Sequence, residues 1–254
     1  MRTFYGFFSM AMLSLSPGLL ADSPYREGNG WHGIVGLGLL AKTEPYIEED
    51  ATILPIPYLI MRQGKFFIEG LKVGLRTLEG SSGHFDIILT PRLEGFDADD
   101  SIYFSGMENR DFSLDGGLAT KLRQGMVEFN LSVVTDLLDK SDGQEITASM
   151  GHTYIALNRN ATVTPSLGLK WQSSDLVNYY YGVQPHEATV TRPAYTGKAT
   201  LNYTAKLQVT YLLGKRSSLM GGIEYEYLGD KIVDSPLLDE KQVVNFFMGY
   251  GWQF

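Results

Sequence analysis

The sequence has no cysteine, so neither disulfide bonds nor thiol chemistry can contribute to its fold or its function. It also lacks a basic excess: 21 Lys and Arg stand against 29 Asp and Glu, and the net charge of -8 disfavours binding to nucleic acid. Beyond its first 21 residues, no segment approaches the roughly 18 consecutive apolar residues that a membrane-spanning helix needs. These absences exclude a disulfide-stapled domain, a nucleic-acid-binding protein and a helical membrane protein.

The N-terminus carries the features of an export signal. Arg2 supplies a positive charge, and the short apolar core FYGFFSMAMLSL follows it and ends before Pro17. Cleavage after Ala21 removes residues 1–21 and leaves 22–254, which no repeat, low-complexity run or linker divides. We therefore predict a signal peptide followed by a single domain; a buried N-terminal element is the alternative.

Apolar and polar residues alternate along most of the remaining chain. In residues 199–213, for example, Ala, Leu, Tyr and Val at odd positions alternate with Thr, Asn, Lys and Gln at even ones. A period of two is typical of a strand with one apolar face and does not fit a helix. Many of these stretches are long enough to cross a bilayer at a tilt. The twelve predicted strands, of which the fifth is the weakest, are 31–41, 52–62, 65–78, 84–95, 100–106, 111–123, 125–138, 144–158, 160–172, 198–214, 217–228 and 242–254.

Short and long connections alternate between these stretches. The short ones are 62–65, 96–100, 123–125, 157–160 and 214–218. The others are longer or more acidic, at 42–50, 138–144, 173–197 and 229–241, while 79–83 fits the pattern only weakly. Short turns at one end and long loops at the other are typical of outer-membrane barrels. We therefore predict an all-β, transmembrane, antiparallel up-and-down β-barrel of about 12 strands, or 10 as the alternative count, with both termini periplasmic.

The last strand indicates which way the apolar faces point, because alternation alone also fits a soluble β-sandwich. The chain ends in VVNFFMGYGWQF, with apolar residues at every second position up to Phe254. Gly249, Trp252 and Phe254 match the spacing of the signal that the barrel-assembly machinery reads. Together with export and aromatic residues near strand ends, this favours lipid outside the barrel. The polar faces then enclose a lumen whose charges of both signs could pair and fill it.

The sequence gives no sign of catalysis. The four histidines, at 32, 84, 152 and 186, do not cluster with carboxylates at metal-ligand spacing. Ser149 and His152 lie three residues apart on one predicted strand, so they face opposite sides of the sheet. No phosphate-binding loop or nucleophile elbow is present. We predict that the protein is not an enzyme and has no catalytic residue, metal or cofactor.

One stretch, SSDLVNYYYGVQPHEATVTRPAY at 173–195, has three consecutive tyrosines that cannot all face lipid. We interpret it as a long external loop whose base is anchored at the membrane interface by Tyr179–Tyr181. The alternative is a contact surface for a partner or ligand, formed by Tyr179, Tyr180, Tyr181 and Gly182.

The segment SSDLVNYYYGVQPHEA, followed by RPAY, resembles a hallmark of the MipA/OmpV family of Gram-negative outer-membrane proteins. The C-terminal SPLLDEKQVVNFFMGYGWQF and the internal FFIEGLKVGL and GFDADDSIYFSGMENRDFSLDGGLATKL are also similar to that family. The resemblance spans about Trp31 to Phe254. It implies an outer-membrane barrel without known catalysis. The family's name-giving member is linked to the murein machinery, as a scaffold that joins a lytic transglycosylase to a penicillin-binding peptidoglycan synthase.

We therefore expect an exported outer-membrane scaffold or structural protein linked to peptidoglycan synthesis and remodelling. Its expected partners are outer-membrane lipid, the barrel-assembly machinery and, through the resemblance, those two murein enzymes. Two alternatives stay open: a narrow channel for small solutes, and a surface adhesin or receptor acting through the long acidic loops. The basic residues of the short turns motivate a periplasmic contact; they are Arg62, Lys65, Arg123, Arg159, Lys215 and Arg216.

Overall fold

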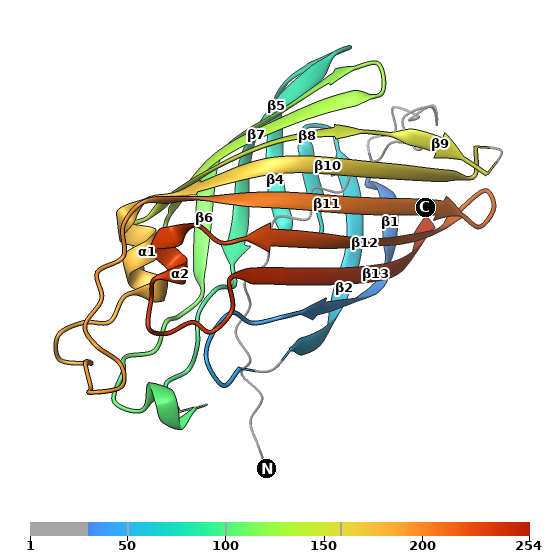
Figure 1. The fold of residues 1–254 in the computed structure, drawn as a ribbon. Coiled ribbons are helices and arrows are strands. Elements are labelled where there is room, and N and C mark those ends of the chain that lie inside the picture. Colours follow the sequence, from blue (N-terminus) through green and yellow to red (C-terminus); the bar gives the residue numbers. More distant parts are fainter. Residues whose placement is uncertain (1–29, 50, 100, 158) are drawn as a thin grey trace.

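The alternating stretches form one antiparallel sheet that closes into a barrel, as a computed structural model of the chain shows (Figure 1). The structure describes residues 30–49, 51–99, 101–157 and 159–254, so the predicted signal peptide at 1–21 lies outside the described residues. The strands are β1 (His32–Lys42), β2 (Thr52–Gln63), β3 (Phe66–Glu69), β4 (Lys72–Gly80), β5 (Gly83–Arg92), β6 (Ser113–Gln124), β7 (Val127–Asp136), β8 (Gln144–His152), β9 (Tyr154–Ala156), β10 (Ala161–Gln172), β11 (Thr200–Leu212), β12 (Ser217–Tyr227) and β13 (Gln242–Gln253). The connections contain the 3₁₀ helix η1 (Ile102–Phe104) and the helices α1 (Ser174–Tyr181) and α2 (Asp230–Val233).

Strand pairing follows the chain around the barrel. Successive strands pair, β13 pairs with β1, and β10 pairs with β11. Segments β8 and β9 both pair with β10 and are separated only by Thr153, so they are one interrupted barrel strand. The closed barrel therefore has 12 strands, which confirms the predicted fold class and strand count.

Two of the predicted strands are nevertheless wrong. Residues 65–78 form two strands, β3 and β4, because Gly70 takes a left-handed conformation (φ 63°) that allows a tight turn between them. The described part of 100–106 forms no strand. It contains η1, whose cap Ser101 accepts a hydrogen bond from the backbone N–H of Tyr103 at 3.0 Å. The two errors cancel in the strand count.

The connections differ between the two ends of the barrel. The short-turn end has the turns 64–65, 81–82, 125–126, 157–160 and 213–216. The long-loop end has the connections 43–51, 70–71, 93–112, 137–143, 173–199 and 228–241. The predicted turn at 96–100 therefore belongs to a long loop, and 79–83 holds a short turn. Strand β1 begins and β13 ends at the short-turn end, whose periplasmic location stays a prediction.

Apolar side chains cover the outside of the barrel, and charged side chains line its interior. Leu37 and Leu167 are 78% and 68% exposed, whereas Glu128 and Lys170 are 3% and 5% exposed. The apolar faces therefore point outward, as predicted for a barrel surrounded by lipid. The described residues include no helix with the length and hydropathy that crossing a membrane requires.

Candidate functional site

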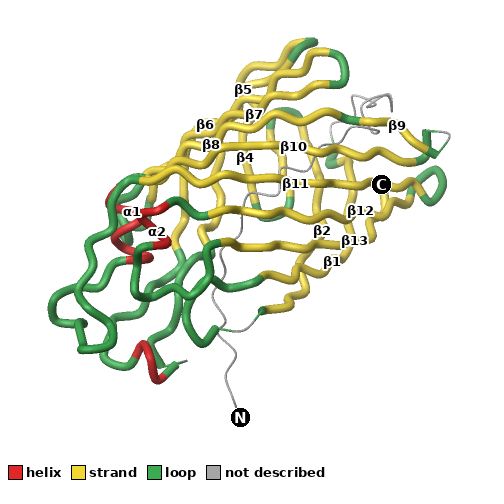
Figure 2. The backbone as a smooth tube through the Cα atoms, in the orientation of Figure 1, coloured by secondary structure: helices red, strands yellow, loops and turns green. Residues whose placement is uncertain are grey.

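Side chains from the long loops form a hydrophobic core at one end of the barrel, where the helices and most of the loop structure gather (Figure 2). We call this cluster the loop core. The rings of Phe96 and Phe104 stack at 4.4 Å between centroids, and Tyr46 meets Phe96 edge-on at 5.3 Å. Burial of these apolar side chains holds loops together that are distant in sequence. Its buried members are Tyr46, Phe96, Ala98, Phe104, Met107, Leu176, Val177, Tyr180, Tyr181, Val183, Leu228, Ile232, Leu237 and Val243.

Helix α1 carries the tyrosine segment into the loop core. The helix begins after Ser173, whose hydroxyl accepts a hydrogen bond from the backbone N–H of Leu176 at 3.3 Å. Tyr180 and Tyr181 are 0% and 5% exposed, and Gly182 is buried at the helix C-cap. The predicted interfacial anchor is therefore wrong for these two tyrosines, because a helix turns their rings inward. Among the residues of the predicted contact surface, only Tyr179 is partly exposed.

Hydrogen bonds join the buried tyrosines to other loops. The hydroxyl of Tyr180 donates to the carbonyl of Asp111 at 3.2 Å, and that of Tyr46 donates to the carbonyl of Tyr180 at 3.3 Å. Ser235 donates to the carbonyl of Tyr181 at 2.7 Å. Burial raises the pKa of Tyr181 well above its ordinary value, so this ring stays neutral. The tyrosines therefore act as structural links between four loops.

A buried ion pair joins two of these loops. Nη2 of Arg110 donates to both carboxylate oxygens of Glu187, at 2.8 and 3.0 Å, in charge-assisted hydrogen bonds. Desolvation disfavours the charged carboxylate, but hydrogen bonds from Arg110 and from the N–H groups of Glu108 and Gln184 lower the pKa of Glu187 below its ordinary value. Arg192, which is 2% exposed, donates to the carbonyls of Tyr103, Ser105 and Glu187.

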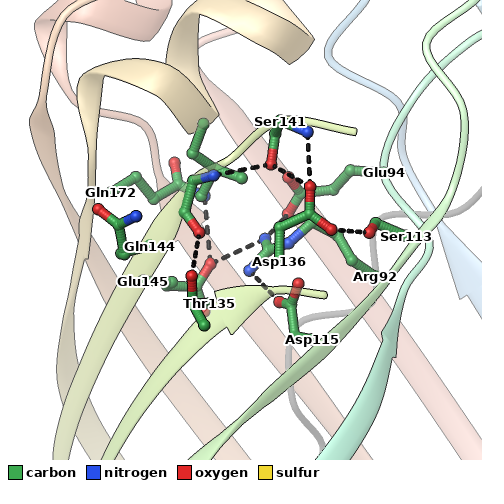
Figure 3. Close-up of polar contacts among 12 residues, drawn as sticks. Arg92, Glu94, Ser113, Asp115, Thr135, Asp136, Ser141, Gln144, Glu145 and Gln172 are labelled. Carbon is green, nitrogen blue, oxygen red and sulfur yellow. Dashed lines mark hydrogen bonds and ion pairs between the residues drawn. The ribbon is translucent and has the colours of Figure 1, made fainter. Parts of the chain in front are cut away.

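A layer of buried charges lies in the lumen, and Figure 3 shows the part of it around Arg92. Arg92 lies 2.5 Å from Asp115, 3.0 Å from Glu145 and 3.4 Å from Glu94. Lys170 pairs with Glu226 at 2.6 Å, and Lys42 pairs with Glu44 at 2.7 Å. These eight residues come from six strands and two long loops, and the Arg92–Glu145 and Lys170–Glu226 pairs join strands that are not neighbours in the sheet. The predicted cross-linking of lumen charges is present in the structure. We call this set of eight residues the charged layer.

One carboxylate organises the loop beside this layer. Asp136, at the end of β7, accepts hydrogen bonds from the N–H groups of Leu138, Lys140 and Ser141 at 2.9, 2.7 and 2.6 Å, and also from the hydroxyl of Ser113 (Figure 3). These bonds fold residues 137–143 tightly over the barrel rim. A single residue therefore fixes a loop that the sequence shows only as acidic.

A polar cavity of about 100 Å³ remains in the middle of the lumen. Its charged lining is mixed in sign, and one wall consists of small hydroxyl-bearing residues on β8, β10 and β11, including Thr147, Ser166 and Thr204. This volume equals that of about three waters in the liquid. The cavity is separated from the long-loop end by the charged layer and the loop core.

Comparison with known proteins identifies the family. A model of the family described as MltA-interacting protein MipA matches residues 35–254. The chain belongs to this family. It is 25% identical over 223 residues to the MltA-interacting protein of Escherichia coli K12, covering 87% of this chain and 89% of that protein. It is 28% identical over 144 residues to outer membrane protein OmpV of Vibrio cholerae, covering 57% of this chain and 55% of that protein.

The similarity to solved structures is low. A loop-deletion mutant of OmpT from Vibrio cholerae covers 88% of this chain and 99% of its own, at 10% identity and a TM-score of 0.37. The family match and the names of the relatives place this MipA-family chain in the outer membrane, as the sequence predicts.

Three loop residues of this MipA-family barrel come together in a way that the sequence did not indicate. Glu108, His186 and Glu187 each offer a ligand atom within 4.8 Å of the others, the only such set found among the described residues. His186 Nε2 lies 3.5 Å from Glu108 Oε1. Arg110 already occupies both oxygens of Glu187, however, and its charge repels a metal cation. The geometry therefore favours an ion-paired loop contact over a metal site.

The predicted assembly signal lies on β13, which pairs with β1 and β12 and so closes the barrel. Trp252 and Phe254 face outward and are 47% and 52% exposed. Gly249 faces the interior, where an added Cβ would lie 3.3 Å from the ring of Tyr58. Recognition of these three residues by the assembly machinery stays a prediction.

The basic residues of the short turns fall into two groups. Arg62 and Arg123 are neutralised by Glu79 and Glu128, at 2.5 and 3.0 Å. The other four form no ion pair with any residue that the structure describes, and all are exposed: Lys65, Arg159, Lys215 and Arg216. The short-turn end therefore presents an uncompensated positive surface.

Proposed function

We propose that this MipA-family chain is a closed, non-enzymatic outer-membrane barrel that serves as a scaffold for peptidoglycan synthesis and remodelling complexes. The observation that carries the proposal is the double closure of the lumen, by the loop core and by the charged layer beneath it. A barrel whose lumen is filled in this way has its two ends, rather than a pore, as its working surfaces.

The chemistry of the partner comes from the relatives. One of them is named MltA-interacting protein, which supports a lytic transglycosylase as a partner of this chain. A penicillin-binding peptidoglycan synthase is the second partner that the sequence resemblance implies. The exposed cations of the short-turn end suit an acidic patch on such an enzyme, because complementary charge steers encounter and sets orientation. We place this end in the periplasm, where murein enzymes work.

A capture experiment tests the scaffold role. Tagged protein purified from detergent-solubilised outer membranes is expected to retain a murein enzyme, identified by mass spectrometry. The double variant Lys215→Gln/Arg216→Gln is expected to retain less of it. The matched control, Lys198→Gln/Lys241→Gln, removes two exposed cations at the long-loop end and is expected to retain the wild-type amount. Capture of no murein enzyme, or equal losses from both variants, would contradict the proposal.

Two other measurements separate the alternatives. A channel requires an open path, so we expect planar bilayers containing the protein to show no conductance steps; steady unitary currents would favour the channel. An adhesin would work from the opposite end. Deleting residues 174–191 would destroy α1 and the loop core, so the adhesin is better tested by replacing exposed loop carboxylates such as Asp239 and Glu240.

A further inference from the structure

The barrel wall is incomplete on one side. Strand β3 has only four residues and pairs with β2 at residues 60–63 alone. The turn at Gly70 ends the β3–β4 hairpin there, with the N–H of Gly70 donating to the carbonyl of Leu59 at 2.7 Å. From Thr52 to Tyr58, no described residue pairs with β2 on the side of β3, although β1 pairs with all of it on the other side.

The opposite edge of this gap is the last part of β5. Strand β4 pairs with β5 only up to Leu89, which lies opposite Val73, whereas β6 pairs with β5 as far as Arg92. The gap therefore lies between β2 and β5, on the long-loop side of the short β3–β4 hairpin. A contact between the side chains of Ser101 and Glu48, at 2.6 Å, bridges it at the loop end. We call this opening the lateral window.

Prolines line both edges of the lateral window. Along β2, odd-numbered residues point their backbone groups at the window, as the carbonyl of Leu59 shows, and Pro55 and Pro57 are odd-numbered. On β6, the carbonyl of the even-numbered Leu114 accepts a hydrogen bond from the N–H of Leu137, so even-numbered residues of β6 point their backbone groups away from β5. The odd-numbered residues of β6 therefore hydrogen-bond to their even-numbered partners on β5, and odd-numbered residues of β5 point their backbone groups toward the window. Pro91 therefore faces the window as well. Proline has no N–H, so these edges expose fewer unsatisfied donors than other residues would leave.

The window lies at the level of the lipid chains. Pro57 and Pro55 pair across to Leu37 and Leu39 on β1, which are 78% and 48% exposed on the outer surface. Hydrocarbon cannot satisfy a backbone N–H, so removal of donors by proline is what an edge in contact with lipid requires. The remaining strand proline, Pro165, follows the same rule, because it lies opposite the break between β8 and β9.

Behind the β2 edge of the window the lumen is apolar, whereas the β5 edge turns the polar Thr90 and Arg92 inward. Strands β1, β2, β12 and β13 turn a cluster of apolar side chains inward: Ile34, Leu40, Ile56, Tyr58, Ile60, Met220 and Phe247. The interior of a membrane barrel is ordinarily polar. A cavity of about 30 Å³ touches both the rim, at Pro57 and Leu71, and the inner wall, at Ile56 and Phe247. Met220, which is unbranched and flexible, also lines it and can adjust to an occupant.

We propose that the lateral window admits the acyl chain of a bilayer lipid to the apolar side of the lumen. The occupant follows from the surroundings: the window opens onto hydrocarbon, prolines remove donors from its edges, and the wall behind its β2 edge is apolar. A polar solute would leave its hydrogen-bonding groups unsatisfied on this route. This binding site is independent of the scaffold role, since a scaffold needs no opening toward lipid.

Spin labels test the proposal directly, because the chain has no native cysteine. Single-cysteine variants at Ile56 (inner wall at the window), Thr147 (polar lumen wall) and Leu37 (lipid-facing surface) are labelled and reconstituted in phosphatidylcholine–phosphatidylglycerol vesicles. Collision with lipid-soluble oxygen and with a water-soluble nickel chelate is then measured. We expect the oxygen-to-nickel ratio at Ile56 to match that at Leu37 and to exceed that at Thr147. A ratio at Ile56 like that at Thr147, or no access to either reagent, overturns the proposal.

A second measurement uses the unmodified protein and so does not depend on variants that fold. Vesicles containing phosphatidylcholine with a photoactivatable diazirine in its acyl chain are irradiated, and the adducts are mapped by mass spectrometry. We expect adducts at inward-facing Ile56 or Phe247 as well as at outward-facing Leu37. Thr147, on the polar wall of the lumen, is the internal control and is expected to carry none. Adducts confined to outward-facing residues overturn the proposal.

Discussion

Removing one member of the Lys170–Glu226 pair tests whether water reaches the charged layer. The Nζ–Oε2 distance is 2.6 Å, and both side chains are 6% exposed. At an effective dielectric constant of about 20, two unit charges at this distance attract by about 6 kcal/mol. Taking each ion out of water costs several kcal/mol, so the pair as a whole contributes little net stability. An unpaired buried charge, in contrast, keeps its desolvation cost without the attraction.

We therefore expect Lys170→Met to lower the free energy of unfolding by about 3–5 kcal/mol, because it leaves Glu226 buried with only the hydrogen bond from Asn202, at 2.7 Å. Adding Glu226→Gln removes the unpaired charge and keeps an acceptor for Asn202. We expect the double variant to recover most of the lost stability. The measure of this pairing is the coupling free energy of the double-mutant cycle.

Urea unfolding of the protein in detergent micelles, followed by tryptophan fluorescence, supplies these free energies. Lys215→Met is the control, because Lys215 is exposed in a short turn, and we expect it to change stability by less than about 0.5 kcal/mol. If Lys170→Met matches this control, the pair is solvated by water in the lumen. That result would refute the closed lumen on which the proposed scaffold role is based.

Three further predictions concern the window, the loops and the orientation. Pro57→Ala gives β2 an N–H that faces the window without a partner, so we expect it to cost about 1–3 kcal/mol in urea unfolding, whereas Pro185→Ala in an exposed loop costs little. Because the pKa of Glu187 is lowered, its pairing with Arg110 stabilises the fold at pH values above the ordinary carboxyl pKa of about 4.3. This stabilisation is lost as the pH falls from that value through the lowered pKa. Glu187→Gln should flatten the acid limb of a plot of melting temperature against pH, and an unchanged limb would contradict this. In intact cells, an impermeant maleimide should label Asp239→Cys and not Lys215→Cys; the reverse pattern would invert the proposed orientation.

The barrel could be predicted from the sequence because its cause is local. An alternating strand such as β11 shows its two faces in its own residues, and the lumen charges follow from the same period of two. The strand count was correct although two boundaries were not. A tight turn at Gly70 inside a continuous apolar stretch has the same local pattern as an uninterrupted strand. Local alternation therefore predicts faces better than it predicts where a strand ends.

The loop core could not be predicted in the same way, because its contacts join residues far apart in the chain. The bond from Tyr46 to Tyr180 spans 134 positions, and no local pattern specifies it. One local signal was available, however. Ser173 precedes buried residues at Leu176, Val177, Tyr180 and Tyr181, which is the spacing of a capped amphipathic helix. The spacing of these four buried residues indicates a helix with one buried face, which three consecutive tyrosines do not indicate by themselves.

The strand prolines carried a second signal that alternation concealed. Proline cannot donate to a ladder, so Pro55, Pro57 and Pro91 within long amphipathic strands indicate places where a neighbouring strand is missing. In a barrel with every strand paired, three such residues would be costly. In this barrel they lie at the one gap that a four-residue β3 leaves. The short hairpin and the prolines therefore explain each other: a truncated neighbour creates an unpaired edge, and proline makes that edge tolerable in lipid. The loop core and the charged layer close the lumen at the long-loop end. A molecule that reaches the apolar side of the lumen from this half of the barrel therefore has to pass through the barrel wall.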